Sequence, residues 1–191
     1  NLSDHIDLFT NLRVLDLSGN ELTTLPESLA SLPDLTALVL HGNPLETLPI
    51  NAIPTSVEYL YLSDTQLTTL PADIDRLTNL RVLHISGNQL TELPSTIGNL
   101  EQLNALYGGG NRLTELPSSI GMLENLAVLH VAGNNLATLP SSIGFLGNLR
   151  TLNLLGNNLE ALPQSLGSLR SLRVLRIEEN LLQRLPATLG Q

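Results

Sequence analysis

The side chains of this chain that could do chemistry are its histidines, its tyrosines and a few serines, and most of them recur at one spacing. Tyr107 lies midway between His84 and His130, and Ser63 and Ser86 are separated by the same step of 23 residues. Imidazole can act as a general base or bind a metal, and a serine beside it can become a nucleophile. The spacing therefore raises three possibilities: a metal site, a hydrolase site or a recognition surface.

The first two possibilities are poorly supported. If each step of 23 residues reaches a neighbouring strand, His84 and His130 lie about 10 Å apart at the backbone, whereas zinc ligands must lie about 2 Å from one ion. The chain has no cysteine, and neither Ser63 nor Ser86 lies in the glycine-framed turn of a nucleophile elbow. The run 108–110 is Gly-Gly-Gly, but the Gly-Lys-Ser/Thr of a phosphate-binding loop does not follow it. We therefore predict no catalytic residue, no metal and no cofactor.

The elements that must position these residues are copies of one repeat, of which residues 80–102, LRVLHISGNQLTELPSTIGNLEQ, are the clearest. Only the copy over 35–56 is one residue short, residues 1–11 have the pattern of the back half of a preceding repeat, and the last copy is truncated. The eight copies start at Leu12, Leu35, Val57, Leu80, Leu103, Leu126, Leu149 and Leu172. A fixed period of this length predicts a solenoid, a single domain over residues 1–191 without internal linkers.

Each copy predicts a short strand, a turn and an irregular or short helical segment. The x-L-x-L-x part alternates as a strand does, with its leucines inward, so successive copies should form a parallel sheet. The turn follows at an asparagine whose buried amide must find hydrogen-bond partners: Asn20, Asn43, Asn88, Asn111, Asn134, Asn157 and Asn180. Thr65 replaces this asparagine once, and we expect its turn to be the loosest. A Leu-Pro pair follows in every copy and suits an irregular or helical segment.

The form L-P-S-S-I-G-x-L-x-N-L-x-x-L-x-L-x-x-N-x-L resembles the 23-residue leucine-rich repeats of Scribble-type scaffolds, plant Ras-group-related repeat proteins and effectors that bacteria inject into host cells. The resemblance covers essentially the whole chain. It implies an α/β leucine-rich repeat solenoid, curved, with its parallel sheet on the concave face. It also implies a non-catalytic module that binds a protein or peptide on that face, in the cytoplasm or after bacterial secretion (type III) into the host cytoplasm.

The resemblance leaves an alternative open. The chain could be the substrate-recognition domain of a larger enzyme, such as a bacterial effector ubiquitin ligase or a repeat-containing GTPase, whose catalytic domain is absent from these residues. Both ends lie within a repeat and the first residue is not Met, so we expect the natural protein to continue beyond at least one end. The oligomeric state is not predicted by the sequence.

Composition narrows the class of partner. The net charge is −9, which argues against nucleic acid, and no apolar run reaches membrane-spanning length. All nine cations are arginine, which fits either a GC-rich genome or selection against ubiquitin attachment to lysine. Secreted animal relatives usually carry disulfide-stapled caps, so the absence of cysteine favours the cytoplasmic or bacterial type. The one glycosylation triplet, Asn1-Leu2-Ser3, lies at the terminus.

The outward strand positions decide where a partner should bind. All three tyrosines and three of the four histidines fall on these positions. Aromatic residues favour strands in any case, but tyrosine and arginine are also enriched at the centres of protein interfaces. The predicted contact residues are Val39, His41, Tyr59, Tyr61, His84, Tyr107, His130, Asn153 and Arg176.

Charge and pH add two expectations. Residues 1–64 hold nine acidic residues against Arg13, whereas residues 149–191 hold five arginines against three glutamates, and this difference could set the direction of an elongated partner. Protonation of the histidines near pH 6 to 6.5 should weaken binding of a cationic partner. Gly108 takes an inward position that is otherwise aliphatic, so either its neighbours close in or the strand there is bent and mobile.

Overall fold

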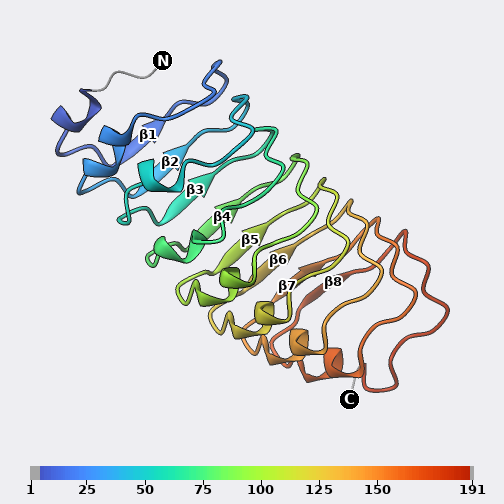
Figure 1. Ribbon diagram of the computed structural model, residues 1–191. Helices are drawn as coiled ribbons and strands as arrows, with labels where there is room; N and C mark the ends of the chain where they lie inside the picture. The colour runs from blue at the N-terminus through green and yellow to red at the C-terminus, as the bar shows by residue number, and fades with distance from the viewer. Residues whose placement is uncertain (1–4, 190–191) are drawn as a thin grey trace.

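Residues 5–189 of the computed structural model form a solenoid whose eight short strands make one parallel sheet, in the order β1 to β8 (Figure 1). Each of the eight predicted repeats contributes one strand to this sheet. The strands are β1 (Val14–Asp16), β2 (Ala37–Val39), β3 (Tyr59–Tyr61), β4 (Val82–His84), β5 (Ala105–Tyr107), β6 (Val128–His130), β7 (Thr151–Asn153) and β8 (Val174–Arg176).

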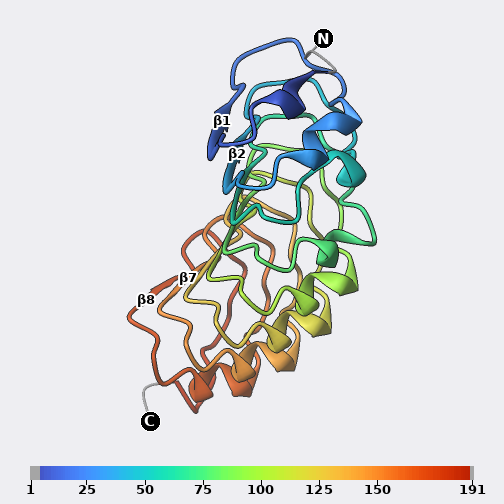
Figure 2. The same ribbon diagram turned by 90° about the vertical axis from the view of Figure 1, so that its left-hand side faces the viewer.

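The opposite side of each coil carries a 3-10 helix, so the predicted short helical segments are confirmed. Five of them begin just after a proline in an extended conformation, which supplies no backbone donor and fixes φ. The helices are η1 (Ile6–Leu8), η2 (Glu27–Ser31), η3 (Ile50–Ala52), η4 (Ile74–Arg76), η5 (Ser95–Asn99), η6 (Ser118–Met122), η7 (Ser141–Phe145) and η8 (Gln164–Ser168). Figure 2 shows the strands along one side of the curved molecule and the helices along the other, so the sheet lines the concave face.

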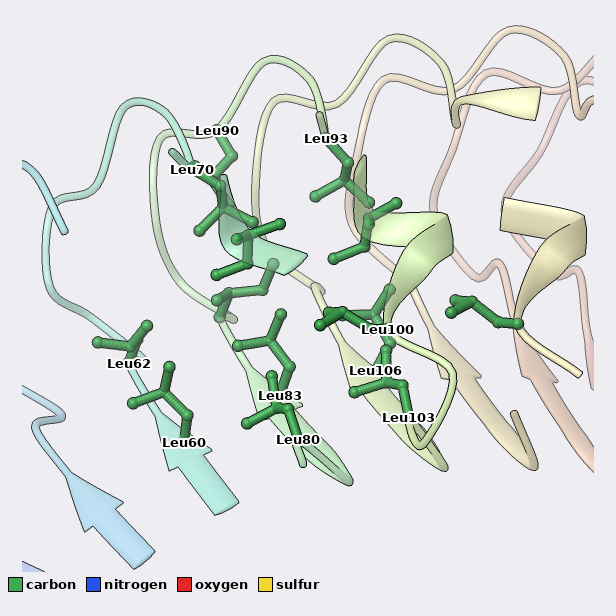
Figure 3. Close-up of a cluster of buried hydrophobic side chains, with 14 of the residues drawn as sticks. Leu60, Leu62, Leu70, Leu80, Leu83, Leu90, Leu93, Leu100, Leu103 and Leu106 are labelled. Carbon is green, nitrogen blue, oxygen red and sulfur yellow. The ribbon is translucent and has the colours of Figure 1, made fainter. Parts of the chain in front are cut away.

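The core between these two sides is aliphatic. Alternation in each strand turns the central leucine inward: Leu60 is fully buried between the outward-facing Tyr59 and Tyr61. Figure 3 shows leucines from successive coils filling the space between the sheet and the convex segments. Each buried leucine contributes roughly 1.5 to 3 kcal/mol through burial of apolar surface. Stacking of identical coils therefore supplies the stability that a single coil lacks.

The asparagine turns have the predicted hydrogen bonds. The Asn88 amide donates to the carbonyl oxygens of Leu62 (2.7 Å) and Ile85 (3.0 Å), and its Oδ1 accepts from the backbone N of Leu67 at 2.9 Å. One buried amide thus joins its own turn to the turn of the preceding coil. The equivalent asparagines at 43, 111, 134, 157 and 180 make the same kinds of contact.

Thr65 shows where one substitution changes this pattern. Its side chain is fully buried, and its hydroxyl donates to the Leu62 carbonyl at 2.8 Å. In the preceding turn the N–H of Leu45, which would otherwise meet an asparagine oxygen, donates to the Asn43 carbonyl at 2.9 Å. The next residue, Glu46, takes a left-handed φ of 57°. The turn at Thr65 is irregular as well, because its two neighbours Asp64 and Gln66 take left-handed φ values of 55° and 63°. The irregularity therefore involves both the turn at Thr65 and the turn before it.

At Gly108 the missing inward side chain leaves only a small space. A Cβ added there would lie 3.7 Å from Val131 Cγ1 and 3.8 Å from Ile85 Cδ1, which is ordinary contact distance. The neighbours have therefore closed in, leaving room for about one methyl group. The triplet Asn1-Leu2-Ser3 lies outside the described residues. No helix among residues 5–189 is long and apolar enough to span a bilayer.

Candidate functional site

The strand register brings seven of the nine predicted contact residues into one row across the sheet. Each strand pairs in parallel with the next without a shift, so the last residues of the strands are direct neighbours. The row is Asp16, Val39, Tyr61, His84, Tyr107, His130, Asn153 and Arg176. Because the sheet lines the concave face, this row runs along the middle of that face.

Five rings on this face are in continuous contact, and we call them the ring row: His41, Tyr61, His84, Tyr107 and His130. The ring centroids of His41 and Tyr61 lie 6.3 Å apart, and those of Tyr61 and His84 6.1 Å. His84 and Tyr107 are stacked, with centroids 5.0 Å apart and planes inclined by 23°. Tyr107 and His130 follow at 6.2 Å. All five side chains are half-buried, so the row offers a rigid surface with phenol and imidazole groups accessible from the concave side.

His41 joins the row from a different position in its repeat, two residues after the end of β2. The residue at this position lies beside the ring of the next coil. Ser63 takes the same position before His84, and its hydroxyl is hydrogen-bonded to His84 Nδ1. Gly109 takes it before His130: a Cβ there would lie 3.0 Å from His130 Nδ1, and that nitrogen is buried with no hydrogen-bond partner. Sequence reasoning missed Ser63 and Gly109 as neighbours of the rings, although this fixed diagonal could have identified them.

The ring row affects the charge state of its central histidine. Burial lowers the pKa of His84 below its ordinary value of 6.5, and the charges of His41 and His130 lower it further, while Asp64 acts in the opposite direction. His84 therefore takes up its proton at lower pH than the pH 6 to 6.5 expected from the sequence. The sequence did not show that this ring is half-buried.

The remaining predicted residues differ in accessibility. Tyr59 is 37% exposed on the neighbouring row, whereas Asn153 is only 5% exposed and its Oδ1 accepts a bond from the Leu155 N–H at 3.1 Å. Val39 is half-buried and Arg176 is exposed. Asn153 thus offers little surface to a partner.

The two ends of the row carry opposite charge. At the first strand, Asp16 accepts bonds from the hydroxyl and backbone N of Ser18 at 2.6 and 2.9 Å. These bonds lower the pKa of Asp16, so its carboxylate remains charged in mildly acidic solution. Arg176 lies at the other end, on β8. A ligand that lies along the last residues of the strands would meet the negative Asp16 first, then the rings, and then the positive Arg176.

Ser63 and His84 form the contact on this face that most resembles part of a catalytic site. Ser63 is 7% exposed, and its hydroxyl meets His84 through Nδ1. No carboxylate among residues 5–189 is hydrogen-bonded to either side chain, so the pair lacks the third member that orients a catalytic histidine. The same residues contain no group of three or more His, Cys, Asp or Glu side chains that could hold a metal ion.

A solenoid of single-strand coils with a continuous exposed sheet defines the class of protein. Sequence models of three leucine-rich repeat families match it in succession: leucine rich repeats in two copies over residues 10–52, a leucine-rich repeat region over 55–132 and a leucine rich repeat over 124–182. Together with the single parallel sheet, these matches make the chain a leucine-rich repeat solenoid.

Known proteins extend this likeness. Chaoptin of Drosophila melanogaster is 44% identical over 55 residues, which are 29% of this chain and 4% of chaoptin. A leucine-rich repeat protein of Leptospira interrogans superposes with a TM-score of 0.76 and 32% identity, over 98% of this chain and 54% of that one. The Arabidopsis receptor kinase HAESA, solved with the peptide hormone IDA and the co-receptor SERK1, gives 0.78 and 25%, over 93% and 32%. This chain therefore spans about half of the Leptospira protein and a small part of chaoptin.

Proposed function

We propose that this chain is a non-catalytic recognition module that binds a protein or peptide partner on its concave face. The observation that carries the proposal is the ring row: five contacting His and Tyr side chains on the exposed face of one sheet. Rings packed against one another lose little conformational entropy on binding, and tyrosine is enriched where interfaces gain most of their energy.

The size of the face supports a specific complex. Eight strands about 4.8 Å apart span about 34 Å, and a specific interface needs about 800 Å² per partner. The opposite charges of Asp16 and Arg176 support one orientation for an elongated ligand. HAESA, a structural neighbour of this fold, binds a peptide hormone, and leucine-rich repeat domains are typically non-catalytic.

Selection from a displayed library of random peptides tests the proposal. The chain has no tryptophan and all three tyrosines lie on the concave face, so tyrosine fluorescence reports on this face alone. Peptides selected on the wild type should change that emission on binding. The variant with Tyr61→Ala and Tyr107→Ala should lose at least about tenfold in affinity for them, as hot-spot residues do.

Phe9→Ala is the matched control, because it removes an exposed ring outside the sheet. It should leave the affinity unchanged. Selected peptides that bind the double tyrosine variant as tightly as the wild type would refute the concave site.

We infer that the repeats belong to the 23-residue intracellular class. The alternative to a free-standing recognition module is that this chain is the substrate-recognition domain of a larger enzyme. The lysine-free composition favours that context, because lysine is the acceptor in ubiquitin attachment and a recognition domain that works beside a ubiquitin ligase would escape modification. Sequencing the gene on both sides of this segment tests it. An in-frame catalytic domain supports the enzyme context, and flanking sequence that encodes only further repeats or a stop codon contradicts it.

A further inference from the structure

A second surface lies away from the ring row, where the convex helices η5, η6 and η7 end and the chain turns back to the sheet. A groove of about 720 Å³ opens there, and we call it the convex groove. Its volume lies within the range of about 300 to 1,000 Å³ that is usual for ligand sites. Its residues are Gly98, Asn99, Glu101, Gln102, Gly121, Met122, Glu124, Asn125 and Phe145.

Two large apolar side chains form one part of the groove. Met122 is 57% exposed and Phe145 is 74% exposed. They take the same position in successive repeats, at the ends of η6 and η7, where four other copies carry Ser31, Arg76, Asn99 and Ser168. Gly147 lies close to Phe145 in sequence, and a Cβ added there would meet nothing within 4 Å, so the space beside it is open. The two side chains, on neighbouring coils, together form an exposed apolar surface, and such surfaces can be contact sites.

Two carboxylates form the other part. Glu101 and Glu124 also take equivalent positions in successive repeats, and both are exposed. Their backbone groups are used: the N–H of each closes a turn, onto Asn99 and Met122, and the Glu101 carbonyl accepts from the Asn125 amide at 2.8 Å. Neither carboxylate has an ion-pair partner among residues 5–189. Two like charges on neighbouring coils favour a cation close to both.

The floor of the groove is backbone. Gly98 and Gly121 are buried, and a Cβ on either would lie 2.7 Å from the serine Cβ of the next coil. The absence of these side chains lets the convex helices approach closely, so a ligand rests on a closely packed surface. This packing fixes the backbone positions from which the acidic and apolar side chains extend.

We propose that the convex groove binds an arginine-bearing apolar segment of a partner protein. A guanidinium group is planar, presents five donors in a fixed fork and can bond two carboxylates together, and it also stacks on aromatic rings. Its head meets Glu101 and Glu124 while its stem and an adjacent apolar residue lie on Met122 and Phe145. Lysine carries the same charge on a single point and matches this arrangement less well.

The test uses the one methionine of the chain, because protein labelled with ¹³C at the methionine methyl group gives a single NMR signal, from Met122. The probe is the peptide acetyl-Leu-Arg-Leu-Arg-amide, and the control peptide carries neutral citrulline in place of arginine. We expect the Met122 signal to shift saturably with the arginine peptide at concentrations up to about 5 mM, and the citrulline peptide to bind at least about threefold more weakly.

Two charge-matched variants complete the test. Glu101→Gln with Glu124→Gln should weaken the arginine peptide about three- to tenfold, as expected for two exposed ion pairs. Glu92→Gln with Glu115→Gln removes the same charge from adjacent repeats outside the groove and should leave the affinity unchanged. Equal binding of the citrulline peptide, equal weakening by both double variants, or an unmoved Met122 signal would each overturn the proposal.

The convex groove is independent of the ring row. Tyr61→Ala with Tyr107→Ala should leave the Met122 titration as it is in the wild type. Failure of the concave site and failure of the convex groove are therefore separate results.

Discussion

His84 and Tyr107 stack across neighbouring strands, with ring centroids 5.0 Å apart, and this is the closest contact of the ring row. Their positions follow from a parallel register without a shift between β4 and β5. Because the two rings cover each other, both the stability of the face and the protonation of His84 depend on the same pair.

We expect a measurable coupling between the two rings. In a double-mutant cycle of His84→Ala and Tyr107→Ala, the free energies of unfolding should be non-additive by about 0.5 to 1.5 kcal/mol, the usual range for aromatic pairs. Urea unfolding followed by circular dichroism provides the four values. The pair Tyr59 and Tyr107 is the control, since these rings lie on different rows two strands apart, and it should be additive. Additivity in the first pair would show that the rings are neighbours without stabilising each other.

The pH dependence of stability should depend on His84. Its pKa in the folded chain is lowered by burial first and by the charges of His41 and His130 second, against the opposing effect of Asp64. The unfolded chain binds a proton at this residue near its ordinary value of 6.5, whereas the folded chain does so only at lower pH. The free energy of unfolding should therefore fall as the pH drops through 6.5, and this contribution should level off below the folded pKa.

Unfolding of the wild type and of His84→Asn at pH 7.5 and pH 5.5 isolates this contribution. The loss of stability between the two pH values should be smaller in the variant, by less than about 1 kcal/mol because the ring is partly exposed and screened. Other titrating groups are common to both proteins and cancel in the difference. An identical loss in the two proteins would mean that His84 titrates alike in the folded and unfolded chains.

The asparagine turns offer a stability test with an internal control. Asn88 is 6% exposed and joins two coils, so Asn88→Ala leaves buried carbonyl and N–H groups unpaired and should cost at least about 2 kcal/mol. Asn20 is exposed and bonds only within its own turn, to Leu17 and Ser18. Asn20→Ala should therefore cost less than about 1 kcal/mol in the same thermal or urea unfolding experiment. Equal losses would contradict the role of the amide as a link between coils.

Most of the fold was predictable because one repeat fixes one strand, one turn and one convex segment. Once the strands are parallel and without a shift, counting residues is enough to place Tyr61, His84 and Tyr107 side by side. Six of the seven asparagine turns were predictable for the same reason, since an inward-facing amide needs partners and the neighbouring turn is the nearest source. Asn20 differs from the prediction, because it is exposed and bonds within its own turn.

Contacts that depend on side-chain direction could not be predicted by counting. The hydrogen bond of Ser63 to His84 and the burial that lowers the pKa of His84 depend on how each ring leans toward the preceding coil. The convex groove was missed because Met122 and Phe145 lie in a segment whose 3-10 geometry the repeat pattern does not specify. At Thr65 the sequence indicated a weak turn, and Asp64 and Gln66 beside it take left-handed φ values. The change at Leu45 and Glu46 in the preceding turn was not visible in the sequence.

Two glycines at contrasting places provide the last prediction. At Gly108 a methyl group meets Val131 and Ile85 at 3.7 to 3.8 Å, and the backbone there is not left-handed. Gly108→Ala should therefore raise the free energy of unfolding by about 0.5 to 1 kcal/mol, because alanine restricts the unfolded chain and fills the gap.

Gly98→Ala makes the same chemical change, but its Cβ would lie 2.7 Å from Ser119 Cβ and closer still to the Ser119 carbonyl oxygen. That variant should lose about 1 to 3 kcal/mol through overpacking. Chemical unfolding of the two variants beside the wild type distinguishes the sites, and a loss of stability in Gly108→Ala would show that the space at Gly108 does not admit a methyl group.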